Sequence, residues 1–288
     1  MITTVLLFAL GAGTASGTID RDTTFSVPAR AHVRILNPAG DIEVRAVPGR
    51  EGRALADGES DGIEIRRSGD QIRVRLDGMY VGADLQIRLP RDVSLELRGA
   101  DGAIRVKGFG GSVSAEILDG DIDIEGASSV EARSVDGDVR VHDVSGPVSI
   151  ETGEGDTHLA DVTGPIVVNG VDGDIVVEGG SAHSVELSTV SGDLWYGGSV
   201  YDDGEYSLAT HDGDVTFTVA DDVGAHVEVL TYDGGLLPSF PIQLRGEIGS
   251  TAEFTLGSGS ARVSLASFDG DIYLIRPGER SPQDENQR

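Results

Sequence analysis

A short motif, Gly followed by Asp, recurs along the chain at nearly constant spacing and limits the possible folds more than any other feature. The steps are Gly120-Asp121, Gly137-Asp138, Gly155-Asp156, Gly173-Asp174, Gly192-Asp193 and Gly213-Asp214. Successive glycines are separated by 17 to 21 residues. A period of this length is typical of repeat architectures, in which each unit packs only on its neighbours.

Each repeat unit divides into two short segments in which apolar residues alternate with polar ones. In one unit these segments are "SVSAEI" and "DIDIEG", with Asp119-Gly120 between them. Alternation places every second side chain on one face of a β-strand. Across the units, the apolar faces of the second segments form two columns: Ile122, Val139, Thr157, Ile175, Leu194 and Val215, and Ile124, Val141, Leu159, Val177, Tyr196 and Phe217.

The predicted fold class is all-β, a parallel β-helix or β-solenoid with two strands and about 17 to 21 residues per unit. The alternative is an antiparallel meander that closes into a barrel or sandwich, because Asp-Gly between alternating strands also favours hairpins. A meander buries its apolar face only by closing or by meeting another sheet, whereas stacked coils cover one another. The nearly constant period favours the solenoid.

The sequence predicts four segments. Residues 1–17 have the short apolar run and the small residues of a secretory signal peptide, so we expect export to the periplasm or the extracellular space. A buried first strand is the alternative. Residues 18–98 are expected to form a less regular β-rich lead-in, residues 99–275 the repeat solenoid, and residues 276–288 a disordered polar tail. No later run approaches the ~20 apolar residues of a membrane span.

The charge of the chain is strongly negative and unevenly distributed. The formal net charge is -27, and no Lys or Arg occurs between Arg140 and Arg245. Such a surface repels the phosphates of nucleic acids and of anionic lipids, so neither is expected as a partner. A solvated acidic face is the plainer interpretation of this charge.

The repeated acids have a structural interpretation and a chemical one. Gly supplies the positive φ of a tight turn, and the residue before it is expected to bond the turn's amides; these residues are Asp119, Asp136, Asp172, Ser191, Asp212 and Asp269. The aspartates after each Gly would stack ~4.8 Å apart, near the roughly 5 Å of paired glycosidase carboxyls. Every neighbouring pair shares this spacing, which favours the structural interpretation.

The least repetitive stretch, "SGDLWYGGSVYDDGEYSL" at residues 191–208, contains the predicted binding residues. The alternation points Tyr196 inward and Trp195 outward, between Val176 and Thr216 of the adjacent units. An outward Trp beside a glycine loop is suited to contact a partner or a sugar; the alternative is that the loop covers it. The predicted binding residues are Trp195, Tyr201, Asp202, Asp203 and Glu205.

Metal chemistry has few candidates in this sequence. The chain has no Cys, so thiolate sites and disulfides are excluded. Calcium prefers clustered oxygen ligands, and the weak candidates for such a site are Asp202, Asp203, Asp221 and Asp222. These aspartates lie in two segments, residues 200–206 and 220–224, and neither segment fits an EF-hand loop. No histidine pair has the spacing of a helical zinc motif. No cofactor is therefore expected, with calcium as the alternative.

Three stretches, "PAGDIEVRAV", "LPRDVSLELRGADGAIRV" and "SVDGDVRVHDVSGPVSIETGEGD", resemble the bacterial adhesin-like family of β-strand repeat proteins known as domain of unknown function 4097. The resemblance covers roughly residues 25–275. It implies an exported or envelope-associated protein of parallel β-helical character and supplies no catalytic residues. The predicted function is a non-enzymatic scaffold for an envelope, glycan or protein partner; the alternatives are a glycan-active enzyme and a calcium-dependent binding module.

Overall fold

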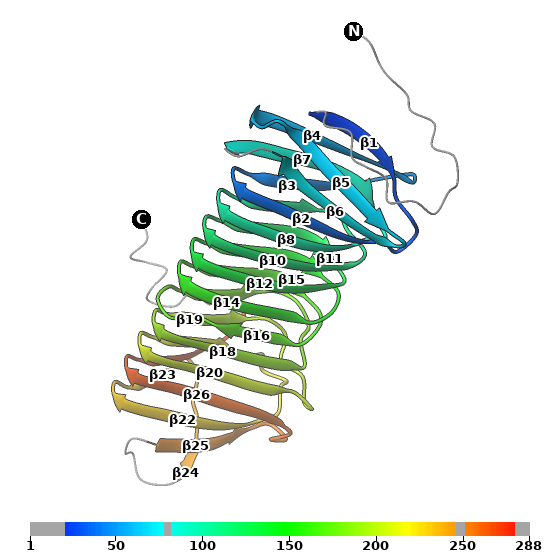
Figure 1. Cartoon of the computed structure of the whole chain (residues 1–288). Coiled ribbons are helices and arrows are strands. Elements are labelled where there is room, and N and C mark those ends of the chain that lie inside the picture. The colour runs from blue at the N-terminus through cyan, green and yellow to red at the C-terminus, as the bar shows by residue number, and fades with distance from the viewer. Residues whose placement is uncertain (1–20, 78–81, 246–250, 280–288) are drawn as a thin grey trace.

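The computed structural model of the chain describes residues 21–77, 82–245 and 251–279, and all regular structure within these ranges is β-strand. The strands stack into one elongated body made of two long sheets (Figure 1). The expected signal peptide and residues 280–288 of the expected tail lie outside the described residues. Within the described ranges, no helix is long and apolar enough to cross a membrane.

We call the two sheets sheet A and sheet B. Sheet A has 14 strands, in the spatial order β24 (Leu244–Arg245), β25 (Thr251–Leu256), β22 (Ala225–Asp233), β26 (Ala261–Asp269), β20 (Glu205–Asp212), β18 (Ser184–Ser191), β16 (Ile166–Asn169), β14 (Val148–Glu154), β12 (Ser129–Asp136), β10 (Ser112–Asp119), β8 (Ser94–Asp101), β2 (His32–Ala39), β6 (Gln71–Asp77) and β5 (Gly62–Ser68). Sheet B has 13 strands, in the order β1 (Asp22–Ser26), β4 (Glu51–Glu59), β7 (Gly82–Pro90), β3 (Ile42–Val47), β9 (Ile104–Lys107), β11 (Ile122–Ala127), β13 (Val139–Val144), β15 (Thr157–Val162), β17 (Ile175–Glu178), β19 (Leu194–Gly197), β21 (Val215–Thr218), β27 (Ile272–Ile275) and β23 (Leu236–Pro238).

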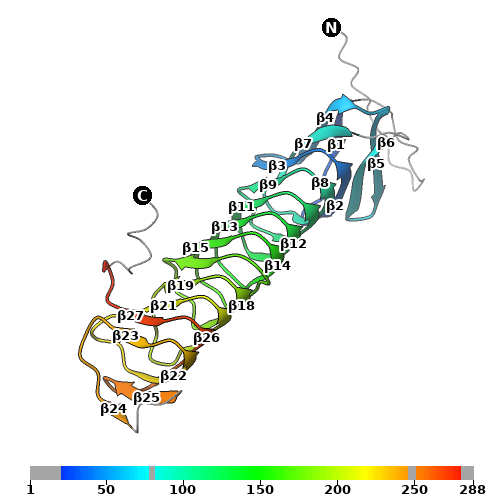
Figure 2. The same ribbon diagram turned by 90° about the vertical axis from the view of Figure 1, so that its left-hand side faces the viewer.

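The repeat units are coils of a parallel solenoid, as predicted. Each coil contributes one strand to sheet A, passes through a Gly-Asp turn, and contributes the next strand to sheet B. Successive coils pair in parallel, as β10 does with β12 and β11 with β13. The Asp-Gly steps therefore join strands of two different sheets and do not form hairpins, so the meander alternative is wrong. Figure 2 shows the two columns of strands that the turns connect.

The core lies between the two sheets, and the predicted columns line it. Ile122 pairs with Val139, and Ile124 with Val141, in the register that the alternation requires. Along the whole column the side chains are buried; even Tyr196 is only 1% exposed. Each coil packs on the coils above and below it, so its stability depends on these neighbours.

The turn glycine is required for two reasons, which Gly173 illustrates. Its φ is +135°, a conformation that residues with a Cβ rarely adopt. A Cβ at this position would also lie 2.3 Å from the carbonyl oxygen of Gly155 in the preceding coil. The turns therefore stack so closely that only glycine fits.

The aspartate after each turn glycine, and not the residue before it, bonds the backbone. The Oδ1 atom of each one accepts a hydrogen bond from the backbone amide at the same position of the next coil. We call this row the aspartate ladder; its carboxylates are Asp121, Asp138, Asp156, Asp174, Asp193, Asp214 and Asp271, with N to Oδ1 distances of 2.7 to 3.0 Å. The sequence-based assignment to the preceding residue is wrong, because the turn aims the following amide along the stack.

Both ends of the stack contain a coil that is out of sequence order. The coil formed by β2 and β3 lies between the coil of β6 and β7 and the coil of β8 and β9. At the other end, the last coil, β26 and β27, is inserted between the coil of β20 and β21 and the coil of β22 and β23. Antiparallel strands complete each end, with β5 on β6 and β25 on β22.

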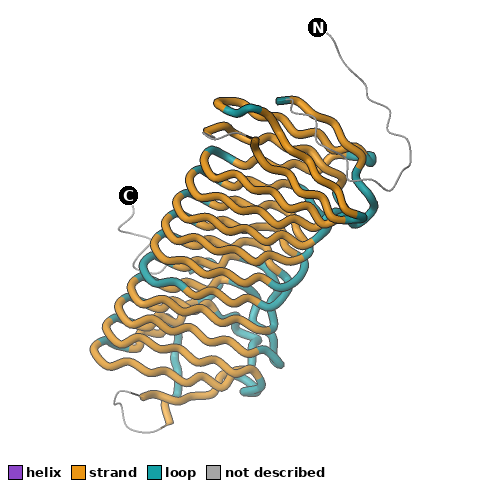
Figure 3. The backbone as a smooth tube through the Cα atoms, in the orientation of Figure 1, coloured by secondary structure: helices purple, strands orange, loops and turns teal. Residues whose placement is uncertain are grey.

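The inserted last coil changes the loop side of the solenoid. The connection from β21 to β22, residues 219–224, has to pass across β27 to reach the coil beyond it. The amide of Val219 donates to the carbonyl of Ile275, which fixes this crossing. Figure 3 shows that the loops lie mainly along one side of the stack and are longer in its C-terminal half.

Candidate functional site

A groove with a volume of about 660 Å³ lies where the connections of the C-terminal coils meet. One side is the loop after β19, and the other is the crossing connection 219–224 together with the segment that follows β27. We call it the Trp195 groove. It exists because the last coil is inserted there, so that one connection bridges two coils and the C-terminal segment leaves the stack beside it.

Trp195 forms one wall of the groove. It lies in register between Val176 and Thr216 on the outer face of sheet B, as predicted. Its indole packs over Gly197, where a Cβ would lie only 2.1 Å from a ring carbon. The side chain is half-buried, so the backbone supports the ring while it still lines the groove.

Thr216 differs from the expectation for this outer column. The sequence placed it on the open surface, but it is completely buried. Its neighbours in register are the larger side chains Trp195 and Tyr273, which flank it on either side. The outer face of sheet B is therefore partly covered at this end of the stack.

Two buried tyrosines hold the loop that forms the groove. The hydroxyl of Tyr196 donates to the carbonyl of Ser199 at 2.9 Å. The hydroxyl of Tyr206 donates to the carbonyl of Ala182 at 3.0 Å and accepts from the amide of Tyr201 at 2.9 Å. Burial raises the pKa of both tyrosines, so both hydroxyls keep their protons at neutral pH. The loop is therefore tied to the core at two of its backbone groups, the carbonyl of Ser199 and the amide of Tyr201.

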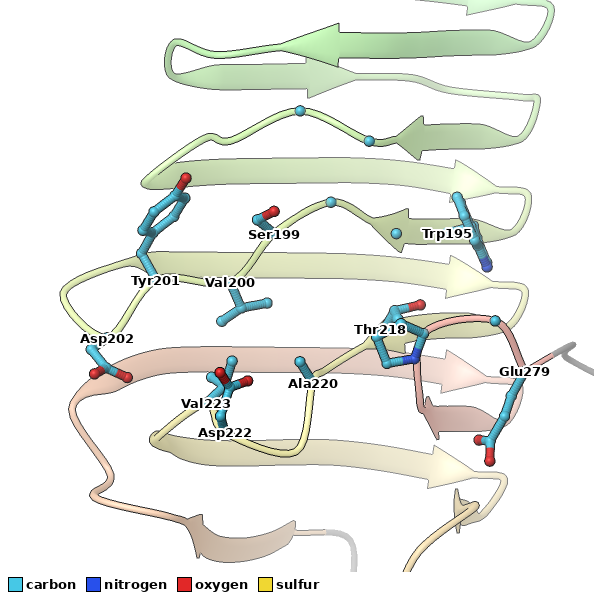
Figure 4. A pocket seen from close by; sticks show the side chains of 16 residues that line it. Trp195, Ser199, Val200, Tyr201, Asp202, Thr218, Ala220, Asp222, Val223 and Glu279 are labelled. Carbon is cyan, nitrogen blue, oxygen red and sulfur yellow. The ribbon is translucent and has the colours of Figure 1, made fainter.

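Tyr201 and Asp202 lie at the far end of the groove from Trp195 and Glu279 (Figure 4). The ring of Tyr201 stacks on His183 with centroids 4.0 Å apart. One carboxylate oxygen of Asp202 accepts from the amide of Gly224 at 3.2 Å, which ties the two sides of the groove together. The two aromatic walls therefore stand at opposite ends of one depression.

The C-terminal segment supplies the acid Glu279 to the groove. Glu279 accepts from the amide of Arg276 at 2.9 Å and from the hydroxyl of Ser239. These two donors lower the pKa of Glu279, so it is ionised at neutral pH. Residues 276–279, which belong to the segment expected to be a disordered tail, thus form a closed turn beside the groove.

The groove is acidic, and Arg276, which precedes the lining residue Pro277, is already engaged. Asp202, Asp222 and Glu279 line it, and none of its described lining residues is Lys or Arg. Arg276 donates to the carbonyl of Val219 at 2.9 Å and pairs with Asp221 at 2.8 Å. The groove can therefore offer aromatic surfaces and hydrogen-bond acceptors to a ligand.

The structure brings some predicted residues together and separates others. Trp195, Tyr201, Asp202 and Asp222 line the groove. Asp203 instead bonds His183 at 2.9 Å, and Glu205 forms an ion pair with Arg262 at 3.5 Å. In the part of the chain that the structure describes, no three acidic or histidine side chains are grouped to hold a metal ion.

Sequence reasoning missed two contributors to this site. Tyr206 holds the loop from the core, and Glu279 reaches the groove from the end of the chain. Tyr206 could have been found, because it occupies an inward position of β20 next to the irregular loop. Glu279 could not, because its approach depends on the inserted position of the last coil.

The aspartate ladder has one unusual member, Asp193. Burial raises its pKa, the amide of Asp214 acts in the opposite direction, and the charges of Asp174 and Asp214 raise it further. At the other end of the chain, burial opposes ionisation of Asp41, but the amide of Ala103 and the guanidinium of Arg105 outweigh it and lower its pKa. Asp193 does not line the groove, and its carboxylate bonds the backbone as its neighbours do.

Comparison with known proteins identifies a family by its sequence model. The model described as Toastrack DUF4097 matches residues 87–274. A solved structure of a candidate cell adhesion protein from Clostridium sporogenes is 11% identical with a TM-score of 0.28, covering 88% of this chain and 98% of that one. A candidate adhesin from Bacteroides fragilis is 12% identical with a TM-score of 0.37, covering 88% of this chain and 96% of that one. No curated protein matches the sequence.

Proposed function

Because the chain belongs to the Toastrack DUF4097 family, we propose that it is an exported, non-enzymatic, adhesin-like scaffold that holds a partner in the Trp195 groove. The observation that carries this proposal is the partly exposed indole of Trp195 in the wall of a groove whose loop is fixed by Tyr196 and Tyr206. A rigid aromatic wall supplies contact area at little entropic cost. The partner is a glycan or a protein of the cell envelope.

The loop contacts support binding more than bond cleavage. Asp202 and Glu279 both accept hydrogen bonds from backbone amides, which fixes them in position, and the lowered pKa of Glu279 keeps it ionised. A general acid of a glycosidase instead needs a raised pKa beside its substrate. Export is supported by the signal-like pattern of residues 1–17.

A binding screen tests this function. The full chain is applied to an array of bacterial and host glycans and to fractionated envelope proteins, with and without calcium. We expect at least one ligand whose binding Trp195→Ala weakens about tenfold or more, as a central aromatic contact would. Val176→Ala is the matched control, because Val176 is next to Trp195 in the same outer column but does not line the groove.

Three results would replace the proposal. Shortened glycan products released by the protein would favour the glycan-active enzyme. Binding that appears only with calcium and is lost in Asp222→Asn would favour the calcium-dependent module. Equal binding by Trp195→Ala and the parent chain would place the binding surface outside the groove.

A further inference from the structure

A row of exposed apolar side chains runs along the outer face of sheet A, beside the Gly-Asp turns. Its members occupy the same register position in eight successive coils: Leu118, Val135, Gly153, Val171, Val190, His211, Phe268 and Tyr232. We call this row the apolar ridge. Each of its six large apolar side chains is at least 47% exposed, although the same strands bury their inward residues almost completely.

The ridge is broadest and most aromatic at its C-terminal end. Phe268 stacks on Tyr232 with centroids 4.7 Å apart and rings 4° from parallel, and it stacks on His211 at 4.7 Å. Leu230, two residues before Tyr232 on β22, is also 51% exposed. The three stacked rings hold one another in place and form an ordered apolar edge.

A row of carboxylates accompanies the ridge. The next residue along the chain is acidic in seven of these eight coils, and all seven are exposed: Asp119, Asp136, Glu154, Asp172, Asp212, Asp269 and Asp233. Ser191 interrupts the row. Since no Lys or Arg occurs between Arg140 and Arg245, this charge is not neutralised by neighbouring coils in the middle of the stack.

Six large apolar side chains exposed in one row, interrupted at Gly153 and His211, are more than the scattered single apolar residues of an ordinary surface, and exposed apolar patches mark contact sites. We propose that the apolar ridge docks a basic amphipathic helix of a partner protein, with apolar side chains of the helix on the ridge and its Lys or Arg side chains on the acidic row. Charge complementarity selects this partner. A second copy of the chain is disfavoured, because two ridges in contact would bring two acidic rows together.

The dimensions of the ridge fit such a helix. Coils stack at the strand spacing of about 4.8 Å, so eight coils extend the ridge over roughly 34 Å. A helix rises 1.5 Å per residue, so about 22 residues span this length. The ridge and the Trp195 groove lie on different sheets, so this inference does not depend on the function proposed for the groove.

Three synthetic 22-residue helical peptides test the proposal by fluorescence anisotropy with the full chain. The Leu-Lys peptide has an apolar face bordered by Lys, the Leu-Glu peptide has the same apolar face with opposite charge, and the Ser-Lys peptide has the charge alone. We expect the Leu-Lys peptide to bind at least tenfold more tightly than either of the others. Raising the salt concentration should weaken this binding without abolishing it.

Variants of the protein locate the contact. The triple variant Val171→Ser, Val190→Ser and Phe268→Ser should lose tenfold or more of its affinity for the Leu-Lys peptide. Leu237→Ser, which removes an exposed apolar side chain from sheet B, should leave that affinity unchanged. Circular dichroism checks that each variant folds.

Two results would overturn the proposal. If the triple variant binds the Leu-Lys peptide as the parent chain does, the attraction is only the general acidity of the protein. If the parent chain sediments as a dimer and the triple variant as a monomer, the ridge is the contact between two copies and not a site for a basic helix.

Discussion

The carboxylate of Asp156 accepts a hydrogen bond of 2.9 Å from the backbone amide of Asp174 in the next coil. The same bond repeats along the aspartate ladder, so each turn supplies the acceptor that the following turn needs. Without it, this amide at the turn would have no partner within its own strand pair, and a backbone donor left unpaired costs free energy. The Gly-Asp repeat is therefore a structural requirement of the stack.

The ladder predicts a difference between two substitutions at one position. Asp156→Asn keeps an oxygen acceptor and removes one of several stacked charges, so its melting temperature should equal or exceed that of the parent chain. Asp156→Ala loses the acceptor and should be less stable by about 1 kcal/mol in urea unfolding. Asp172→Ala, an exposed acid before the turn glycine, is the control and should change little. Equal losses in the two Asp156 variants would show that charge, not the acceptor, is required.

The turn glycine predicts a larger effect. Gly173→Ala adds a Cβ that would lie 2.3 Å from the carbonyl oxygen of Gly155, so the turn has to shift away from the preceding coil. The φ of +135° adds backbone strain for a residue with a Cβ. We expect a loss of about 3 kcal/mol in the free energy of unfolding. Gly49→Ala has a similar φ of +105° but no atom within 4 Å of the new Cβ, so it should cost only about 1 to 2 kcal/mol. Similar losses would mean that the close stacking of turns contributes little.

The fold could be predicted in detail because one rule repeats. Alternation fixes which side chains face inward, and the constant spacing fixes which coils are neighbours, so the register of Ile122 with Val139 followed from the sequence. The out-of-order coils at the two ends did not follow. Nothing local to β26 distinguishes pairing with β22 from pairing with β20, since its inward apolar positions suit both neighbours.

The pH dependence of stability should have opposite signs at two aspartates that follow a turn glycine, Asp193 and Asp41. Asp193 has a raised pKa, so its contribution is fully present below the ordinary Asp value of 3.8 and is lost as the pH rises through the folded-state pKa. Asp193→Asn keeps an acceptor and should melt at a higher temperature than the parent chain at pH 7. This advantage should shrink toward pH 4.

Asp41 is the matched position with the opposite shift. Its pKa is lowered, so its contribution is present above 3.8 and is lost as the pH falls through the folded-state pKa. Asp41→Asn should therefore melt below the parent chain at pH 7 and approach it in acid. Melting curves of both variants from pH 3 to 7 check the two signs, and parallel curves for the two variants would contradict the assignment.

The candidate site was only partly predictable. Trp195 and Tyr196 were assigned to opposite faces by alternation alone, and the structure agrees, because strand geometry leaves no other choice. The bonds of Asp202 to Gly224 and of Glu279 to Arg276 depend on how two loops and the end of the chain meet. Such contacts between distant segments have no signature in the local sequence.

The two faces at Trp195 and Tyr196 predict opposite responses to truncation. Tyr196→Ala removes a ring that stacks on Phe217 at 5.3 Å and should cost about 3 to 5 kcal/mol in urea unfolding. Tyr196→Phe removes only the bond to Ser199 and should cost about 1 kcal/mol. Trp195→Ala should melt close to the parent chain. Unfolding of Trp195→Ala with a stable Tyr196→Ala would reverse the assignment of the two faces.

The parallel stack predicts that one interior coil can be removed. Deleting residues 138–155 joins Gly137 to Asp156, which restores a Gly-Asp turn. The amide of Asp156 then takes the place of the Asp138 amide as the donor to the carboxylate of Asp121. The strands β11 and β15 then become neighbours in sheet B. Ile122 pairs with Thr157, and the side chains of both residues face the core. Contacts in a solenoid are between neighbours, so far-UV circular dichroism should keep its β signal and melting should remain cooperative.

Removing the last coil is the contrasting test, because that coil is inserted and not terminal. A chain ending at residue 260 lacks β26 and β27, which leaves the buried Val215 and Phe217 of β21 without their partners. The strands β22 and β23 then lose the parallel partners β26 and β27 that join them to the rest of the stack, and β22 keeps only the antiparallel β25. Limited proteolysis should cut this shortened chain after about residue 218 and leave the deletion of 138–155 intact. A protease-resistant C-terminal part in the shortened chain would show that the inserted coil does not hold this end of the stack together.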